Sequence, residues 1–170
     1  MVQDQAFRLR QMTRQRQARH SAPSRLLPLV VVTGGKGGVG ASTIAYQTAN
    51  SLTQTGHRAL FVEADLDRGS RVGTSNAGLT LVDCLQTGVP LLDVVCETSD
   101  GTATIPGAWA PSRLAEYSAT AQKRLLSELQ ELRDRFDVAL IDLGSGRNEF
   151  VRRFWGAAAM AVVVTTSEPT

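Results

Sequence analysis

The 170-residue chain contains few cysteines and no long apolar run. Its two cysteines, Cys84 and Cys96, lie far apart and form no C-x-x-C pair, so two free buried thiols are favoured over a metal or redox motif. No apolar stretch approaches the roughly 20 residues of a membrane-spanning helix, and the basic N-terminus is not followed by the apolar core of a signal peptide. The sequence therefore predicts a cytoplasmic protein.

Acidic residues are scarce in one region, the first 25 residues. This arm carries six arginines and only Asp4, a net charge of +5, which leaves −3 on the remaining chain. Ala6, Leu9 and Met12 share one helical face, which predicts a short helix followed by a flexible tether. A solvated basic tail and binding to nucleic acid or acidic lipid are both open at this point. The expected organisation is an arm at residues 1–25 and one domain at residues 26–170.

A glycine-rich stretch, Gly34 to Thr43, organises the domain. It follows the apolar run Leu26 to Val32 and precedes a segment with helical spacing, Ile44 to Leu52. This order of strand, glycine loop and helix is typical of a phosphate-binding loop, in which backbone N–H groups at a helix N-terminus surround an anion. The hydroxyl of Ser42 would hold Mg²⁺ beside the phosphates.

One position departs from the simple phosphate-loop pattern G-x-x-x-x-G-K-[ST]. The pattern fits residues 35–42 except that Ala41 stands where the lysine is expected. The loop therefore lacks a cation at this position, although Lys36 supplies another earlier in the loop. The loss of charge-assisted phosphate contacts predicts weaker nucleotide binding and slower turnover.

Two carboxylates follow predicted strands. Asp65 comes after the strand at residues 58–63, and Asp142 ends the apolar strand at residues 137–142, before Leu143-Gly144-Ser145-Gly146. Ligands of open α/β sheets bind at the carboxyl ends of strands. Asp65 would orient an attacking water and Asp142 would serve Mg²⁺, the alternative for Asp65 being a solvated acidic turn.

The remaining pattern alternates strands and helices. Further strands are expected at residues 103–107 and 161–166, and helices at residues 79–85, 125–136 and 150–155, with Thr80 as a helix cap. Near-continuous apolar strands separated by helices predict an α/β fold, a doubly wound and mainly parallel sheet with helices on both faces. The end of the chain soon after the fifth strand suggests C-terminal truncation.

Four segments together resemble the MinD/ParA family of dimerising ATPases with a deviant phosphate loop. They are residues 34–43, 63–66, 142–146 and 164–170. The resemblance implies a P-loop NTPase that binds ATP and Mg²⁺ and forms a homodimer when ATP is bound, with peripheral contact at the inner membrane as a further expectation. Carried over by position, Lys36 and Asp65 would be catalytic, and Ser42 and Asp142 would bind the metal. The nucleotide would be held by Gly35, Lys36, Gly37, Gly38, Val39, Gly40, Ala41, Ser42 and Thr43.

Within that family, the arm resembles the N-terminal helix of the flagellar branch, FlhG, FleN and YlxH. The similarity lies in Asp4, Gln5, Ala6, Leu9 and Arg10, and it implies docking to a signal-recognition-type GTPase of the FlhF kind. The leading hypothesis is an ATP-binding regulator of flagellar placement, number or assembly. The alternatives are a non-catalytic interaction module and a ParA-type partitioning or chain-length kinase protein, and nucleic acid stays open as a partner.

Overall fold

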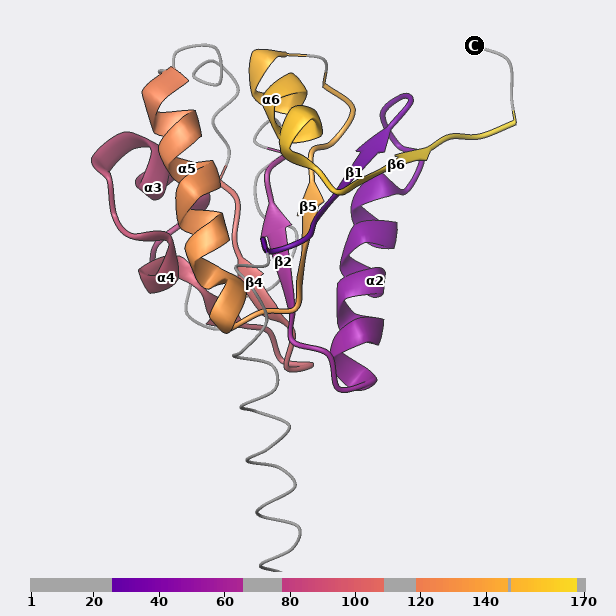
Figure 1. Cartoon of the computed structure of the whole chain (residues 1–170). Helices are drawn as coiled ribbons and strands as arrows, with labels where there is room; N and C mark the ends of the chain where they lie inside the picture. Colours follow the sequence, from indigo (N-terminus) through magenta and orange to yellow (C-terminus); the bar gives the residue numbers. More distant parts are fainter. Residues whose placement is uncertain (1–25, 66–77, 109–118, 147, 168–170) are drawn as a thin grey trace, which may run out of the picture.

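A six-stranded sheet forms the centre of the protein, whose computed structural model describes residues 26–65, 78–108, 119–146 and 148–167. The strand order is β3-β4-β2-β5-β1-β6 (Figure 1). The strands are β1 (Leu29–Gly34), β2 (Ala59–Glu63), β3 (Cys96–Glu97), β4 (Ala103–Ile105), β5 (Val138–Asp142) and β6 (Met160–Val164). All neighbours run parallel except β3 and β4, which are antiparallel.

The central strands are apolar because helices cover both of their faces. Every residue of β2 is buried, and β1 and β5 are buried except at one position each. Parallel strands buried on two faces show such continuous apolar runs, whereas a half-exposed strand alternates. The order also places β1 between β5 and β6, so the carboxyl ends of β1, β2 and β5 meet at one edge. The phosphate loop follows the end of β1, Asp65 follows β2, and Asp142 is the last residue of β5.

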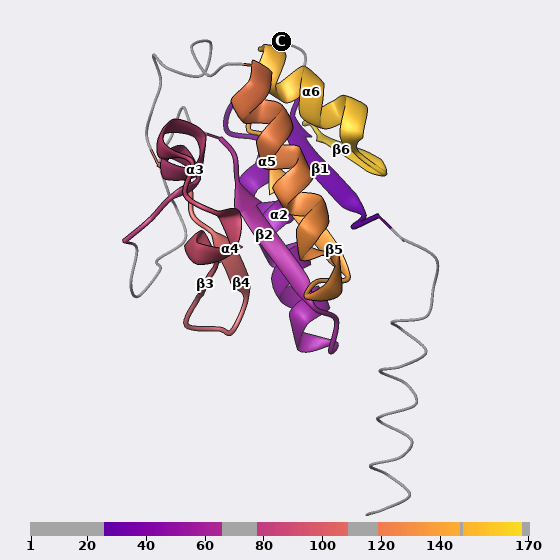
Figure 2. The same ribbon diagram turned by 60° about the vertical axis from the view of Figure 1, so that its left-hand side comes forward.

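Helices lie on both sides of the sheet, as the second view shows (Figure 2). On one side, α2 (Ala41–Gln54) packs against β1, β2 and β5. On the other side lie α3 (Leu81–Thr87), α4 (Leu91–Val94), α5 (Ala119–Glu131) and α6 (Glu149–Ala157). The predicted doubly wound, mainly parallel architecture is therefore confirmed.

Local chemistry explains where several of these elements begin and end. Thr80 and Asp83 form a capping box at the start of α3, and Gly56, with φ of 86°, follows the end of α2. The helix expected at residues 125–136 ends earlier, because a 3₁₀ turn at Leu132–Asp134 tightens its end. The expected strand at residues 103–107 stops at Ile105, before Pro106, which has no N–H to donate to a sheet.

Two elements had no clear signal in the sequence. The two-residue strand β3 and the four-residue helix α4 are both shorter than the windows over which hydrophobic periodicity is informative. The arm, residues 1–25, lies outside the described residues. Among those described, no helix is both long enough and apolar enough to span a bilayer.

Candidate nucleotide site

The glycine loop joins β1 to α2 as the sequence predicts. Gly38 and Gly40 have φ values of 83° and 86°, a region that glycine enters without strain. Gly40 is the N-cap of α2 and makes no side-chain capping bond, so the first turn presents backbone N–H groups toward the loop. A Cβ on Gly34 would lie 2.8 Å from the Lys36 carbonyl oxygen, so only glycine allows this turn. The result is an anion cradle at a helix N-terminus.

A small pocket of about 40 Å³ lies in this loop. Asp65 and Ser42 line it together with Lys36, so it brings together a cation, a carboxylate and a hydroxyl. Its lining residues are Gly34, Lys36, Gly37, Gly38, Val39, Gly40, Ala41, Ser42, Asp65, Gly144 and Ser145. Most ligand pockets measure roughly 300 to 1,000 Å³. This pocket is much smaller, so it would hold only the phosphate group of a larger ligand, with the rest of that ligand outside it.

Ala41, which stands where the phosphate-loop pattern expects a lysine, makes apolar contacts. Ala41 is only 7% exposed and belongs to the small core on the α2 side of the sheet, with Val32, Ala45 and Phe61 among its members. Its Cβ lies 3.6 Å from the position that a Cβ on Gly34 would occupy, so it points into the loop. A longer side chain at position 41 would therefore enter the phosphate pocket.

The segment after β5 closes the other side of the pocket. Gly144 has a φ of 63°, and a Cβ there would lie 2.4 Å from Cγ of Asp65, so the Asp65 carboxylate packs directly on the Gly144 backbone. The Gly144 carbonyl oxygen accepts hydrogen bonds from the Gly34 N–H at 2.8 Å and from the Thr33 hydroxyl at 2.7 Å. Asp65, the segment after β5 and the start of the phosphate loop thus form one packed unit.

The second predicted carboxylate, Asp142, is placed differently. It is 3% exposed, and its Oδ1 accepts a hydrogen bond from the Gly144 N–H at 3.1 Å. It pairs across the sheet with Glu63, whose Oε2 accepts the Gly107 N–H at 3.0 Å. Asp142 therefore shapes the turn at Gly144 and does not line the pocket itself.

The structure brings most predicted nucleotide-binding residues together, with two exceptions. Thr43 is exposed and does not line the phosphate pocket, and Gly35 lines a neighbouring pocket instead. The predicted partner-binding residues Asp4, Gln5, Ala6, Leu9 and Arg10 lie outside the described residues. Gly34 and Ser145 were not predicted as site residues, although Gly34 ends β1 and Ser145 follows the Gly144 turn.

The neighbouring pocket was missed by sequence reasoning. It measures about 490 Å³ and shares Gly34 and Ser145 with the phosphate pocket. Its other lining residues are Thr33, Gly35, Gly146, Val151, Arg152, Trp155 and Val163. The available signal was Trp155, a large aromatic residue at the end of the helix expected at residues 150–155, and the structure leaves it 45% exposed.

The residues present fit a magnesium-bound phosphate group. The loop supplies backbone N–H donors and Lys36, and Ser42 and Asp65 supply oxygen atoms of the kind that Mg²⁺ prefers. Among the described residues, no group of three or more His, Cys, Asp or Glu side chains forms a metal site of its own. An ion here would take ligands from the phosphates as well as from the protein, as Mg²⁺ commonly does.

A family comparison matches this geometry. Residues 28–169 match the model of an AAA domain, AAA_31, which covers most of the chain. The chain belongs to this AAA-domain family. The predicted resemblance to MinD/ParA-type ATPases, nearest the flagellar FlhG/FleN/YlxH branch, is confirmed.

Three curated relatives of this AAA-domain chain illustrate the match. The antiactivator FleN of Pseudomonas aeruginosa is 28% identical over 150 residues, which cover 84% of this chain and 51% of FleN. The flagellum site-determining protein YlxH of Helicobacter pylori is 26% identical, over 83% of this chain and 49% of YlxH. The septum site-determining protein MinD of Bacillus subtilis is 27% identical, over 82% and 53%. The chain spans about half the length of these relatives.

A solved structure supports the fold. The septum site-determining protein MinD of Pyrococcus horikoshii, complexed with Mg-ADP, superposes with a TM-score of 0.71 at 23% identity. The match covers 84% of this chain and 59% of that one. The AAA-domain family assignment and the shared fold therefore agree.

Proposed function

We propose that this chain is the nucleotide-binding part of a MinD-like regulator of flagellar placement, number or assembly, and that it acts as an ATP switch. The observation that carries the proposal is the phosphate pocket, where Lys36, Ser42 and Asp65 converge on a helix N-terminus. The flagellar relatives FleN and YlxH support the cellular role. Binding of Mg·ATP would favour a homodimer, and hydrolysis would reset it.

Each residue has a proposed task. The loop N–H groups would bind the phosphates, and Lys36, which lines the pocket, would neutralise their charge. Ser42 would hold Mg²⁺ directly, whereas Asp142 would act indirectly, by stabilising the turn at Gly144. Asp65 would orient the attacking water. When bound, Mg²⁺ offsets charge that develops on the phosphate oxygens.

Hydrolysis is proposed to be weak, because Ala41 places a methyl group where a second cation would contact the phosphates. One charge-assisted hydrogen bond contributes about 1.5 to 3 kcal/mol, so its absence corresponds to a tenfold or greater loss of affinity. The absence of a lysine at position 41 also favours a second candidate, a non-catalytic interaction module that retains the fold without a nucleotide cycle.

Titration calorimetry with Mg·ATP tests both candidates. We expect weak binding by the native chain, binding at least tenfold tighter in Ala41→Lys, and no detectable binding in Lys36→Ala. Lys123→Ala is a matched control, because Lys123 on α5 is the only other lysine of the chain and lies outside the pocket. Binding by neither the native chain nor Ala41→Lys would leave the interaction module as the function.

The partner is proposed to be a signal-recognition-type GTPase that binds the arm, residues 1–25. The support is the sequence pattern at Asp4, Gln5, Ala6, Leu9 and Arg10 together with the flagellar relatives. Removal of residues 1–20 should abolish stimulation of GTP hydrolysis by that partner. Unchanged stimulation by the shortened chain would contradict docking through the arm.

A further inference from the structure

We propose that an acidic surface at one end of α5 binds the basic arm of this same chain, residues 1–25. The acidic surface consists of Leu92 and Asp93 of α4, Glu97 of β3 and Glu131 of α5, and it lies outside the phosphate pocket. The arm is also the segment proposed to bind a partner GTPase, so the acidic surface would hold it in the absence of that partner. The contact needs no nucleotide, and its test does not depend on the ATP switch.

Local contacts bring the four residues of this surface to one region. Glu128 of α5 accepts a hydrogen bond from the Leu91 N–H at 2.7 Å, which joins the start of α4 to the second half of α5. Leu92 and Asp93 follow directly in α4, and Glu131 lies about one helical turn beyond Glu128. Figures 1 and 2 both show α4 beside α5. Strand β3 begins soon after α4 and is at the opposite edge of the sheet from β6.

The carboxylates of the acidic surface are exposed and uncompensated. Asp93, Glu97 and Glu131 all face solvent, and none of the three forms an ion pair with another described residue. Arg133 and Arg135 follow the end of α5, so the excess of negative charge is largest at Asp93 and Glu97. Charges of one sign that lack a partner attract a segment of the opposite sign.

The arm leaves the domain next to this surface. The Leu27 N–H donates to Oε1 of Gln130 at 2.8 Å, and the Leu27 carbonyl accepts from Nε2 of the same side chain at 3.2 Å. Gln130 directly precedes Glu131, so the chain is fixed beside the acidic surface just after the arm ends. Residues 13–25 can extend to roughly 40 Å, whereas the 13 residues of α5 span about 20 Å. Such a tether gives the arm an effective concentration of about 1 mM, so even a weak contact is populated.

The arm matches the acidic surface in charge and in pattern. It carries a net charge of +5, and the helix predicted from Ala6, Leu9 and Met12 has an apolar face beside its arginines. Leu92, which is 39% exposed among the carboxylates, offers a contact for that apolar face. Arginine side chains at the rim of such a contact reach the carboxylates while their stems cover apolar surface.

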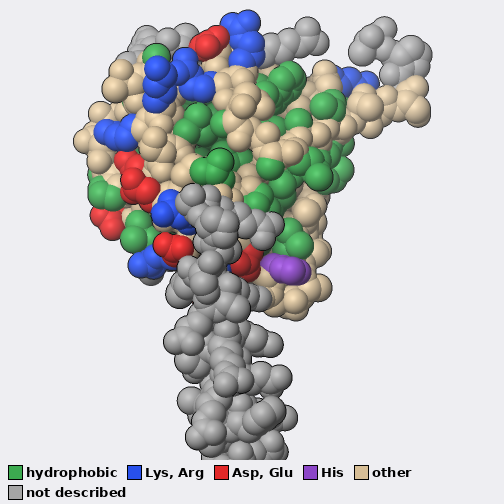
Figure 3. All heavy atoms as spheres, in the orientation of Figure 1, with side chains coloured by type: hydrophobic (Ala, Val, Ile, Leu, Met, Phe, Trp, Pro, Cys, Tyr) green, Lys and Arg blue, Asp and Glu red, His purple; other side chains and the backbone are tan. Residues whose placement is uncertain are grey.

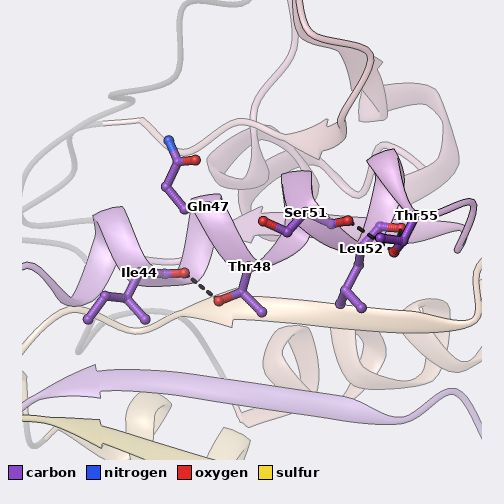
Figure 4. A pocket seen from close by; sticks show the side chains of 6 residues that line it. All are labelled: Ile44, Gln47, Thr48, Ser51, Leu52 and Thr55. Carbon is purple, nitrogen blue, oxygen red and sulfur yellow. Dashed lines mark hydrogen bonds between the residues drawn. The ribbon is translucent and has the colours of Figure 1, made fainter.

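Other surfaces of the described residues suit a basic segment less well. Figure 3 shows basic side chains mainly toward the end of the molecule where α5 and α6 begin, and Lys123, Arg152 and Arg153 belong to these two helices. Like charges there would repel the arm. Helix α2 has no charged residue, and Figure 4 shows that neutral side chains alone line the groove along it. The acidic surface is therefore the one that attracts the arginines of the arm.

Limited trypsin digestion of the 170-residue chain without nucleotide tests this proposal, because trypsin cuts after the arginines of the arm. In about 10 mM salt we expect the native arm to be cut about tenfold more slowly than the arm of the triple variant Asp93→Asn, Glu97→Gln, Glu131→Gln. About 1 M salt shortens the screening length from roughly 30 Å to 3 Å and should remove most of that difference. Glu149→Gln on α6 is the matched control and should protect the arm as the native chain does. Thermal unfolding of each variant verifies that it is folded.

Two further measurements locate the contact and separate it from the ATP switch. Leu9→Cys combined with Leu92→Cys should form a disulfide within one chain, whereas Leu9→Cys combined with Ser51→Cys on α2 should not. Lys36→Ala should lose Mg·ATP binding and keep the arm protected. A native arm that is cut as fast as that of the triple variant would overturn the proposal and leave the acidic surface to another basic polypeptide. A cross-link to position 51 in place of position 92 would also overturn it, because the arm would then lie on α2.

Discussion

The two faces of the sheet are covered by buried side chains of different size. On the face covered by α3, α4, α5 and α6, the core contains large side chains such as Leu129, Phe150 and Phe154. On the α2 face the buried helix residues are Ala41, Ala45 and Ala49. Small residues let α2 approach the sheet closely and bring its N-terminus to the loop, whereas large ones bury more apolar area. Stability should therefore depend mainly on the first face and ligand binding on the second.

The largest loss of stability is expected for a substitution on the face covered by α3, α4, α5 and α6. Leu129 is fully buried, so Leu129→Ala should lower the free energy of unfolding by about 2 to 5 kcal/mol without changing Mg·ATP affinity of the folded chain. Ala45→Gly, at an equally buried site on α2, should cost about 1 kcal/mol. Urea denaturation measures both. Equal costs at the two sites would contradict the division between the faces.

A smaller loss of stability and a large loss of binding are expected at Gly144. Gly144→Ala adds a Cβ at positive φ and 2.4 Å from Cγ of Asp65, so it should cost about 1 to 3 kcal/mol and displace Asp65 from the pocket. Gly56→Ala is the control, because Gly56 has φ of 86° but open space around it. If both variants bind Mg·ATP like the native chain, Asp65 has no role in the site.

The smallest effect is expected where α2 contacts the β3–β4 hairpin. Hydrogen bonds from Thr98 and Tyr46 hold the pKa of Asp100 at about 2, below its ordinary value. A lowered folded-state pKa stabilises the protein above the unfolded value near 3.9, and this contribution is lost as the pH falls toward about 2. Tyr46→Phe should raise the pKa of Asp100 and cost less than about 1 kcal/mol at neutral pH, because the bond is exposed.

Acid denaturation between pH 6 and pH 2 measures this difference. The native chain should lose more stability over that range than Tyr46→Phe, in which Asp100 contributes less. Identical acid profiles for the two proteins would show that Tyr46 does not influence the Asp100 carboxylate.

Much of the fold and the phosphate site followed from local patterns. Gly34 to Thr43 between an apolar run and a helical segment predicted the loop, and strands ending in or before Asp65 and Asp142 predicted the edge at which it lies. Thr80 was predicted as a helix cap, and the structure shows it in a capping box with Asp83, three residues later. Such features involve neighbours in sequence, so one chain contains enough information to find them.

Other features depend on long-range packing that no local pattern encodes. The order of the strands among the described residues, with β1 between β5 and β6, joins segments far apart in the sequence, which periodicity cannot reveal. The different positions of Asp65 and Asp142 could also be seen only in the structure. Both lie at the ends of apolar strands, but only Asp65 lines the pocket. The antiparallel β3 was too short to register as a strand.

The carbonyl of Gly144 has a mechanical consequence for any switch built on this fold. Because it accepts bonds from both Gly34 and Thr33, the turn beyond β5 cannot shift without releasing two contacts at the base of the phosphate loop. Ligand binding in the phosphate loop and the conformation of that turn are therefore coupled. A conformational change in either the loop or the turn reaches the other through the carbonyl oxygen of Gly144.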